Sequence, residues 1–304
     1  MRNLLGLRAI PEIEYHRPEE LSEALKLLSE LKQNYKIVAG GTDLVPAARR
    51  GGVSFPQHGH AVDISGIKEL DYIVEDSGMV RIGAMTRVSD IVESAVVKKH
   101  VPILAEAADQ LGSLQIRNQG TMGGNLCNAS PAADTAPPLL VLDARVNVTS
   151  INGQRLVPLT EFFTGPGKTI LAPGEMLAEV QIPITKPAVS SCFIKLGRRN
   201  AFTLSIVSVA TLVKVKDGIF DDVRIALGAV APTPTRASKA EEYLTGKETS
   251  EQVIDKGAKI VAGEVKPISD VRASEEYRRD MSYILTKRAI SLSVQRARED
   301  KAQK

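Results

Sequence analysis

The sequence has no tryptophan, and aromatic residues make up only 4% of its 304 residues. Proteins that bind single-stranded nucleic acid stack the bases on aromatic side chains, and this chain has few of them. The net charge is only +3 and no long basic block occurs, whereas a nucleic-acid-binding domain usually carries a clear basic surface. We therefore expect no nucleic acid among the partners of this protein.

Cysteine is also scarce, because Cys127 and Cys192 are the only two in the chain. They could form a single disulfide bridge, but nothing in the sequence indicates secretion. An iron–sulfur cluster usually takes four thiolates, and the two cysteines do not match a structural zinc site. The histidines lack metal-site spacing with carboxylate or thiol neighbours, so we predict that none of the four is a ligand: His16, His58, His60 and His100.

No apolar run approaches the roughly 18 residues needed to span a bilayer. The apolar segment near Met1 is too short for a signal peptide. The content of 43% apolar and 25% charged residues is typical of a globular protein, and the length allows about two domains. We therefore expect a cytoplasmic protein with no membrane span.

The sequence does contain two short glycine-rich segments. Residues 116–134 read I-R-N-Q-G-T-M-G-G-N-L-C-N-A-S-P-A-A-D, and residues 39–44 read A-G-G-T-D-L after an apolar run that predicts a strand. Glycine allows positive φ angles and close approach of the backbone to a ligand. Successive N–H groups in such turns bind anions, most often phosphate. Together the segments predict a ligand with a pyrophosphate between two larger groups.

Hydrophobic periodicity predicts a mixed α/β structure up to about residue 183. Residues 18–33 are predicted as a helix, since Leu21, Leu25, Leu28 and Leu31 form one stripe. The same approach predicts, in order, strand 35–39, helix 43–50, strands 61–64, 70–75 and 79–82, helices 88–97 and 103–111, a partly helical segment 133–142, and a hairpin of 145–151 with 154–158.

A boundary is predicted near residues 183–189, because the pattern changes there. Strands 192–196, 205–215 and 219–229 are predicted to form an antiparallel meander, with Asp217 and Gly218 in a hairpin turn. Three helices are predicted after them, at 237–244, 250–262 and 274–298. The C-terminal part is thus expected to be a three-stranded antiparallel sheet with helices.

With these motifs in place, the chain resembles the FAD-binding medium subunit of the molybdenum hydroxylases. That family includes the xanthine dehydrogenases, the carbon monoxide dehydrogenases and the 4-hydroxybenzoyl-CoA reductases. The motifs that carry the resemblance occur in the family's order: A-G-G-T-D-L at 39–44, T-M-G-G-N-L at 121–126, S-P-A-A-D at 130–134, G-P-G-K-T-I-L at 165–171, E-V-Q-I-P at 179–183 and K-L-G-R-R at 195–199.

The resemblance implies an α+β fold. A two-lobed FAD-binding domain of the PCMH type, similar to vanillyl-alcohol oxidase, is expected over residues 1–183, with its two α/β lobes divided near residues 55–60. A smaller C-terminal medium-subunit domain, with the three-stranded antiparallel sheet and the helices, is expected over residues 184–304.

By resemblance, residues 36–44 and the loop 120–125 wrap the FAD pyrophosphate. Asp134 would accept a hydrogen bond from a ribose or ribityl hydroxyl, because an ionised carboxylate only accepts. Lys195 would lie near the polar edge of the isoalloxazine ring, where a cation favours anionic reduced flavin. No catalytic residue is expected. The expected cofactor-binding residues are Lys36, Ile37, Val38, Ala39, Gly40, Gly41, Thr42, Asp43, Leu44, Gly120, Thr121, Gly123, Gly124, Asn125, Ser130, Asp134, Leu171 and Lys195.

Simpler interpretations of these residues stay open at this point. Gly40 and Gly41 could form a plain strand–helix turn, Asp134 could cap a helix, and Lys195 could be the solvated end of a strand. Many relatives have an Asp-Ile pair after the R-R element. Here Thr203 and Leu204 stand instead, so no role is assigned to them.

The resemblance implies an electron-transfer flavoprotein subunit, an oxidoreductase component. FAD in this chain would accept electrons from two [2Fe–2S] clusters of a small subunit and pass them to an external acceptor. A large molybdopterin-binding subunit would act on the substrate, and the family implies a dimer of heterotrimers as the assembly. Molybdopterin and the clusters would thus belong to the partners. The alternatives are a self-sufficient FAD-dependent oxidase of the vanillyl-alcohol oxidase type and a non-catalytic nucleotide-binding module.

Overall fold

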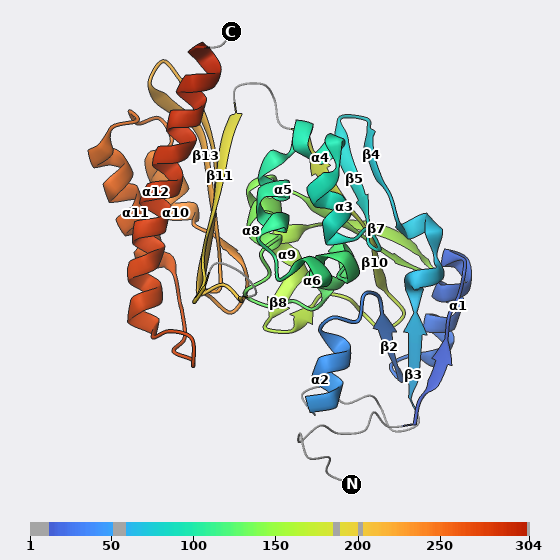
Figure 1. The fold of residues 1–304 in the computed structure, drawn as a ribbon. Coiled ribbons are helices and arrows are strands. Elements are labelled where there is room, and N and C mark those ends of the chain that lie inside the picture. The colour runs from blue at the N-terminus through green and yellow to red at the C-terminus, as the bar shows by residue number, and fades with distance from the viewer. Residues whose placement is uncertain (1–11, 51–58, 185–188, 200–202, 303–304) are drawn as a thin grey trace.

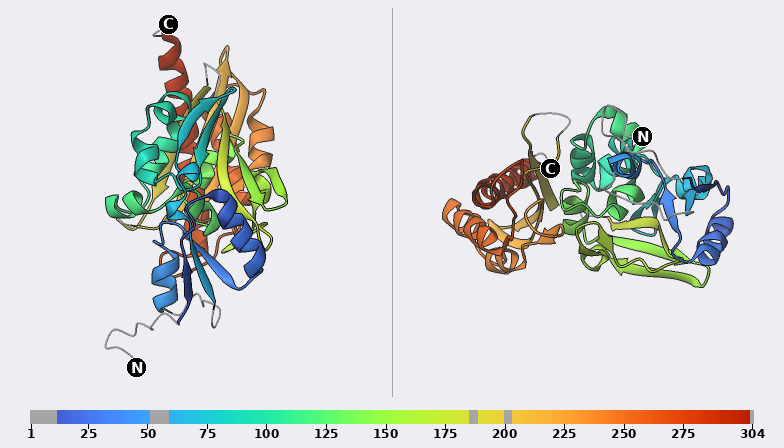
Figure 2. Two further views of the ribbon diagram at one scale, coloured as in Figure 1. Left: turned by 90° about the vertical axis from the view of Figure 1, so that its right-hand side faces the viewer. Right: turned by 90° about the horizontal axis from the view of Figure 1, so that it is seen from below.

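The computed structural model describes residues 12–50, 59–184, 189–199 and 203–302, which form three main sheets with helices between and around them (Figure 1). Figure 2 (right) shows the helix Leu21–Leu31 at one side, the C-terminal sheet and helices at the other, and the central part of the chain, in green, between them. The class is α+β, as the sequence predicted.

The N-terminal lobe is a parallel sheet of three strands in the order β1-β3-β2. The strands are β1 (Glu14–His16), β2 (Tyr35–Val38) and β3 (His60–Asp63), and helix α1 (Leu21–Leu31) packs against them. The predicted leucine stripe carries this packing, since Leu25 and Leu28 are buried in it. Strand β1 was not predicted, because three residues show no clear alternation.

The second lobe is built on an antiparallel sheet of five strands in the order β4-β5-β10-β6-β7. Its hairpin turns fall where the sequence predicted them, and Ser77 and Gly78 both have positive φ. Short helices cover the sheet, and its core continues to the C-terminal sheet. The strands are β4 (Ile73–Asp76), β5 (Met79–Gly83), β6 (Arg145–Ser150), β7 (Gly153–Pro158) and β10 (Met176–Pro183); β8 (Phe163–Gly165) and β9 (Lys168–Thr169) pair separately.

Helices α5 and α8 lie between the five-stranded sheet and the C-terminal sheet (Figure 1). Every residue of α8 is buried, and its two prolines are tolerated because they lie in the first turn, where a backbone N–H has no partner within the helix. The helices of this lobe are α3 (Val88–Glu93), α4 (Ala95–His100), α5 (Pro102–Asp109), α6 (Leu114–Gln119), α7 (Met122–Cys127), α8 (Ala136–Val141) and α9 (Leu159–Phe162), and α2 (Leu44–Arg50) follows β2.

The C-terminal part has an antiparallel sheet in the order β11-β12-β13-β14, so the predicted meander gains a short fourth strand. Helix α12 packs on β11 and β12, and α11 packs on α12. Strand β10 belongs to the five-stranded sheet and β11 to the C-terminal sheet, so the chain passes from one sheet to the other at the predicted boundary. The division into two domains stays a prediction. The elements are β11 (Val189–Leu196), β12 (Val207–Lys216), β13 (Ile219–Gly228), β14 (Thr235–Arg236), α10 (Ser238–Leu244), α11 (Glu251–Glu264) and α12 (Glu275–Ala302).

Two predictions about local structure are wrong. The predicted helix 88–97 divides at Ser94, whose backbone is extended (φ −60°, ψ 121°) and whose Oγ accepts the N–H of Val97 at 3.3 Å to cap α4. The predicted loop 120–125 is largely the helix α7, which begins after Thr121. In both places a hydroxyl residue caps a helix that periodicity does not reveal.

None of the helices in the described part of the chain combines the length and the apolar composition needed to cross a membrane. The cytoplasmic location stays a prediction. Cys127 and Cys192 are both free thiols.

Candidate functional site

The two glycine-rich segments are in direct backbone contact. A Cβ atom on Gly40 would lie 1.9 Å from the carbonyl oxygen of Gln119 and 3.0 Å from the Cα of Gly120. No side chain fits in that space, so glycine is required at residue 40 for close approach. The turn after β2 is thereby held against the junction of α6 and α7.

The turn from β2 to α2 leaves a row of backbone amides unused. Gly41 has φ +68°, the left-handed conformation that favours glycine. Among the described residues, no protein acceptor is found for the N–H groups of Gly41, Thr42, Asp43 and Leu44. Unpaired amides next to a left-handed glycine form a concave site for an anion. The plain strand–helix turn is therefore the weaker interpretation of this segment.

Most backbone amides of the second glycine segment already have acceptors within the protein, contrary to our expectation. The N–H of Met122 donates to the Thr86 carbonyl at 2.9 Å, and that of Gly123 donates to the Ala84 carbonyl at 2.8 Å. The next two amides, of Gly124 and Asn125, donate to Thr121. None of the glycines here has a positive φ. The segment instead contributes close packing and side chains to the site.

Gly123 explains why this segment needs glycine. A Cβ on Gly123 would lie 2.7 Å from the Cβ of Ala84 and 2.9 Å from its carbonyl oxygen. Helix α7 therefore lies directly on the end of β5. This contact places Gly124 and Asn125 beside the turn after β2.

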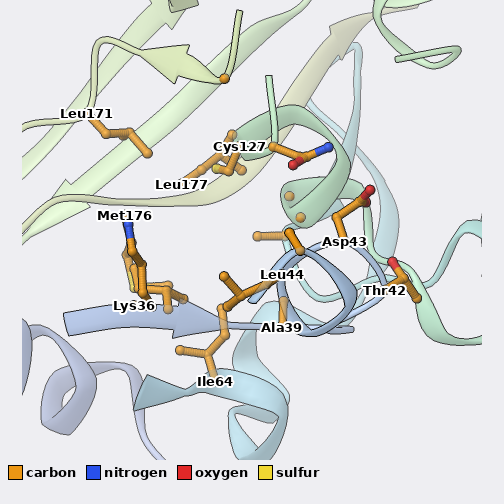
Figure 3. Close-up of a pocket in the computed structure, with 17 residues that line it drawn as sticks. Lys36, Ala39, Thr42, Asp43, Leu44, Ile64, Cys127, Leu171, Met176 and Leu177 are labelled. Atoms are coloured by element: carbon orange, nitrogen blue, oxygen red, sulfur yellow. The ribbon is translucent and has the colours of Figure 1, made fainter. Parts of the chain in front are cut away.

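A cavity of about 360 Å³ opens between the turn after β2 and strand β10. Figure 3 shows Lys36 and Met176 at one end and Thr42 and Asp43 at the other. Most of its walls are apolar, which is usual for a small-molecule site. The lining residues are Lys36, Ile37, Ala39, Thr42, Asp43, Leu44, Ala47, Ile64, Ala84, Gly123, Gly124, Cys127, Asn128, Gly167, Leu171, Met176 and Leu177.

A second cavity, of about 270 Å³, lies on the other side of Thr42 and Asp43, and the two share these residues and Asn128. Residues of the N-terminal lobe, the second lobe and the C-terminal part line this cavity. The C-terminal part contributes the segment before β12. The lining residues are Thr42, Asp43, Leu111, Gly112, Ser113, Ile116, Asn125, Asn128, Ser130, Ala132, Ala133, Asp134, Thr203 and Leu204. The free amides therefore lie where the two cavities meet.

Asn125 presents a side-chain donor to the second cavity. Its Oδ1 accepts a hydrogen bond from the Oγ1 of buried Thr135 at 2.7 Å, which sets the orientation of the amide group. Within the described part of the chain its Nδ2 has no acceptor. A half-buried, oriented donor without a partner is suited to an anionic oxygen of a ligand.

Asp134 and Lys195 form a buried ion pair at the wall of the second cavity. The Lys195 Nζ donates to Oδ2 of Asp134 at 2.6 Å and to the Gln110 carbonyl at 2.7 Å, and Ser205 Oγ donates to Oδ1 at 2.5 Å. The Lys195 and Asp134 side chains are only 6% and 5% exposed. The simpler interpretations, a helix cap and a solvated strand end, are therefore wrong.

Burial raises the pKa of Asp134, whereas Lys195 and Ser205 oppose that rise because they stabilise the carboxylate. Burial also raises the pKa of Asp43, and Arg50 opposes it. Asp43 lines both cavities beside the free amides. Burial raises the pKa of Cys127 to about 12, so this residue is a protonated thiol that packs in the wall of the first cavity.

Most expected site residues come together at these cavities. The first holds Lys36, Ile37, Ala39, Leu44, Gly123, Gly124 and Leu171, the second holds Asn125, Ser130 and Asp134, and both hold Thr42 and Asp43. The others do not line either one: Val38, Gly40, Gly41, Gly120, Thr121 and Lys195. Gly40 and Thr121 line a different cavity.

The structure adds residues that sequence reasoning missed. Asn128 lies within the quoted segment 116–134 but was not singled out, whereas Met176 and Leu177 had no motif that marked them, because their role depends on which strands meet. Thr203 and Leu204 line the second cavity. Their position after the R-R element could have marked them as site residues, because many members of the family have a characteristic pair of residues there.

Two cavities that meet at a turn with unpaired backbone amides are the arrangement expected of a dinucleotide-binding protein. Comparison with family models supports a specific class. The model described as the FAD binding domain in molybdopterin dehydrogenase matches residues 11–185, and the CO dehydrogenase flavoprotein C-terminal domain matches residues 192–292. The chain therefore belongs to the FAD-binding subunit family of the molybdopterin dehydrogenases, as the resemblance predicted.

Individual relatives agree over nearly the whole chain. The xanthine dehydrogenase FAD-binding subunit of Escherichia coli O157:H7 is 35% identical over 92% of this chain and 95% of its own. The carbon monoxide dehydrogenase medium chain of Hydrogenophaga pseudoflava is 32% identical over 92% of this chain and 96% of its own. A solved structure of carbon monoxide dehydrogenase from that organism, lacking the Mo-pyranopterin moiety, matches with a TM-score of 0.91 and 32% identity, covering 95% and 99% of the two chains.

The Gly40 contact leads to a prediction about stability. We expect Gly40→Ala to lower the free energy of unfolding by about 1 to 3 kcal/mol, since the backbone of residue 119 must move away. Gly263→Ala is the control, because nothing lies within 4 Å of the added Cβ in helix α11, and its stability should be unchanged or up to about 1 kcal/mol higher. Urea denaturation measures both. Equal stabilities of the two variants would contradict the contact.

The buried ion pair leads to a prediction about pH. Lys195→Met leaves the Asp134 carboxylate buried without a cation, so we expect a loss of about 3 to 5 kcal/mol near neutral pH. The pKa of Asp134 then rises further above its unfolded value, so the folded variant binds a proton that the unfolded chain releases. The loss should therefore shrink as the pH falls toward about 5.

The double variant Lys195→Met with Asp134→Asn is the control for this prediction. It has no titrating carboxylate at this place, so its loss of stability should shrink less than that of Lys195→Met as the pH falls. A loss in Lys195→Met that is the same at both pH values would show that Asp134 is not the group responsible.

Proposed function

We propose that this chain holds FAD in an extended form across the two cavities and acts as the electron-transfer flavoprotein subunit of a molybdenum hydroxylase. The observation that carries the binding mode is the row of free amides at Gly41 to Leu44, located where the cavities meet. A pyrophosphate there would receive hydrogen bonds from these amides and from Nδ2 of Asn125. When bound, FAD supplies the one- and two-electron redox chemistry.

The first cavity suits the adenosine end of the cofactor. Its walls are largely aliphatic, and Leu44, Leu171 and Leu177 can contact the faces of a flat ring (Figure 3). Lys36 lies at the far end, where a polar edge of the ring would meet a donor.

The second cavity suits the flavin end. The ribityl chain carries several hydroxyls, and Ser130 and Asp134 line this cavity. Asp134 can accept a further hydrogen bond, because each carboxylate oxygen has two lone pairs. Lys195 lies behind Asp134 and places positive charge near this end. Leu204 and Ile116 at the wall are partly exposed (59% and 37%), so the flavin would lie close to the surface for electron transfer.

The proposed partners are a large molybdopterin-binding subunit and a small [2Fe–2S] subunit, assembled as a dimer of heterotrimers. Relatives named medium chain or FAD-binding subunit support an assembly of several different subunits. The iron–sulfur clusters are assigned to the partner because only two cysteines exist in the chain. The chain's own task is to bind and orient FAD and to shield its inner face from water.

We expect Asn125→Asp to weaken FAD binding about 10- to 100-fold, because a donor to the pyrophosphate becomes a repelling carboxylate. The change keeps the shape of the side chain and its Thr135 partner. Asn152→Asp, in the exposed hairpin turn, adds the same charge far from the site and is the control. Titration with FAD, followed by flavin fluorescence, measures both affinities. If both variants bind FAD like the unmodified protein, Asn125 does not contact the pyrophosphate.

A redox experiment separates the subunit role from the oxidase alternative. The purified chain loaded with FAD should show no substrate-dependent bleaching of its flavin absorption, whereas adding the reduced small [2Fe–2S] subunit under anaerobic conditions should bleach it. Reduction by a substrate without partners would instead support a self-sufficient oxidase. A chain that retains no FAD would support the nucleotide-binding module.

A further inference from the structure

Three metal-ligating side chains meet on one face of the N-terminal sheet. Glu14 and His16 lie two residues apart on β1, so their side chains point to the same face of the strand. Strand β1 pairs with β3 in parallel, and the register places His60 directly opposite Glu14. The pairing of β1 with β3 thus brings together residues 44 positions apart.

The distances between the ligating atoms fit a metal ion. His16 Nε2 lies 2.9 Å from His60 Nδ1, and the Glu14 oxygens lie 3.6 Å from His16 Nε2 and 3.5 Å from His60 Nδ1. Zn²⁺ binds imidazole nitrogen and carboxylate oxygen at about 2.0 to 2.2 Å, which puts tetrahedral ligand atoms about 3.3 Å apart. Shifts of a few tenths of an ångström would complete the site.

The environment suits a cation that enters from solvent. The histidine side chains are 23% and 18% exposed, which holds their rings in place, and Glu14 is 66% exposed, which leaves an approach open. The two ring nitrogens in contact cannot both carry a proton. Neutral imidazole is the form that binds metals. Tyr15 and Asp63 hydrogen-bond to each other at 2.5 Å and are not part of the cluster.

We propose that Glu14, His16 and His60 bind one divalent transition-metal ion, with Zn²⁺ as the best fit and a water as the fourth ligand. Two imidazoles and one carboxylate favour zinc and its neighbours over Mg²⁺ or Ca²⁺, which prefer oxygen ligands alone. The ion joins the three-residue edge strand β1 to β3. Strand β3 pairs in turn with β2, which leads into the free amides. The site therefore stabilises the lobe that carries the turn after β2.

This proposal differs from the prediction made from spacing, which treated all four histidines as non-ligands. His16 and His60 are far apart in the sequence, and Glu14 is two residues from His16 on a strand that was not predicted. The register of β1 against β3 is the missing information, and only the fold supplies it.

A competition titration of Zn²⁺ against a chromophoric chelator tests the proposal on the full chain, purified without an affinity tag. We expect one equivalent to bind, with an affinity that falls at least about tenfold in each of Glu14→Gln, His16→Gln and His60→Gln. Zn²⁺ should also raise the melting temperature of the unmodified protein, but not that of His60→Gln. Mg²⁺ should do neither.

His100→Gln is the matched control, since His100 pairs with Glu75 at 2.8 Å outside the cluster, and it should bind Zn²⁺ normally. The thiols do not compete, because burial raises the pKa of Cys127 to about 12 and that of Cys192 to about 11. Circular dichroism checks that each variant is folded. No stoichiometric binding, or binding that the three variants leave unchanged, would overturn the proposal.

Discussion

The contact between Gly40 and the backbone of residues 119 and 120 is the constraint on which the site depends. It leaves no room for a side chain and so joins the N-terminal lobe to the second lobe at one place. The turn after β2, whose amides have no acceptor among the described residues, lines both cavities through Thr42 and Asp43. The positions of the cavity walls and of the amide donors therefore depend on this one contact between two backbone segments.

The buried pair of Asp134 and Lys195 plays a similar role on the C-terminal side. It joins the segment before α8 to strand β11, and Ser205 adds the segment before β12. Two buried charges are tolerable because each has a close partner and a further hydrogen bond. The pair thereby keeps Thr203 and Leu204 against the second cavity.

The sequence predicted the elements with strong periodicity. It also predicted that the two glycine-rich segments belong to one site. The leucine stripe of α1, the meander β11-β12-β13 and the long helix α12 follow directly from residue patterns. The use of the amides could not be predicted, because the N–H groups of Met122 and Gly123 are satisfied by the carbonyls of Thr86 and Ala84, in the turn after β5, far away in the sequence. Edge strand β1 was missed for the same reason, since pairing with β3 defines it.

A crystal structure of the chain with bound FAD tests the account most directly. The account predicts the pyrophosphate within hydrogen-bond distance of the amides of Gly41 to Leu44 and of Nδ2 of Asn125, with the adenine and the isoalloxazine in separate cavities. A pyrophosphate bound elsewhere, with those amides still unpaired, would contradict it.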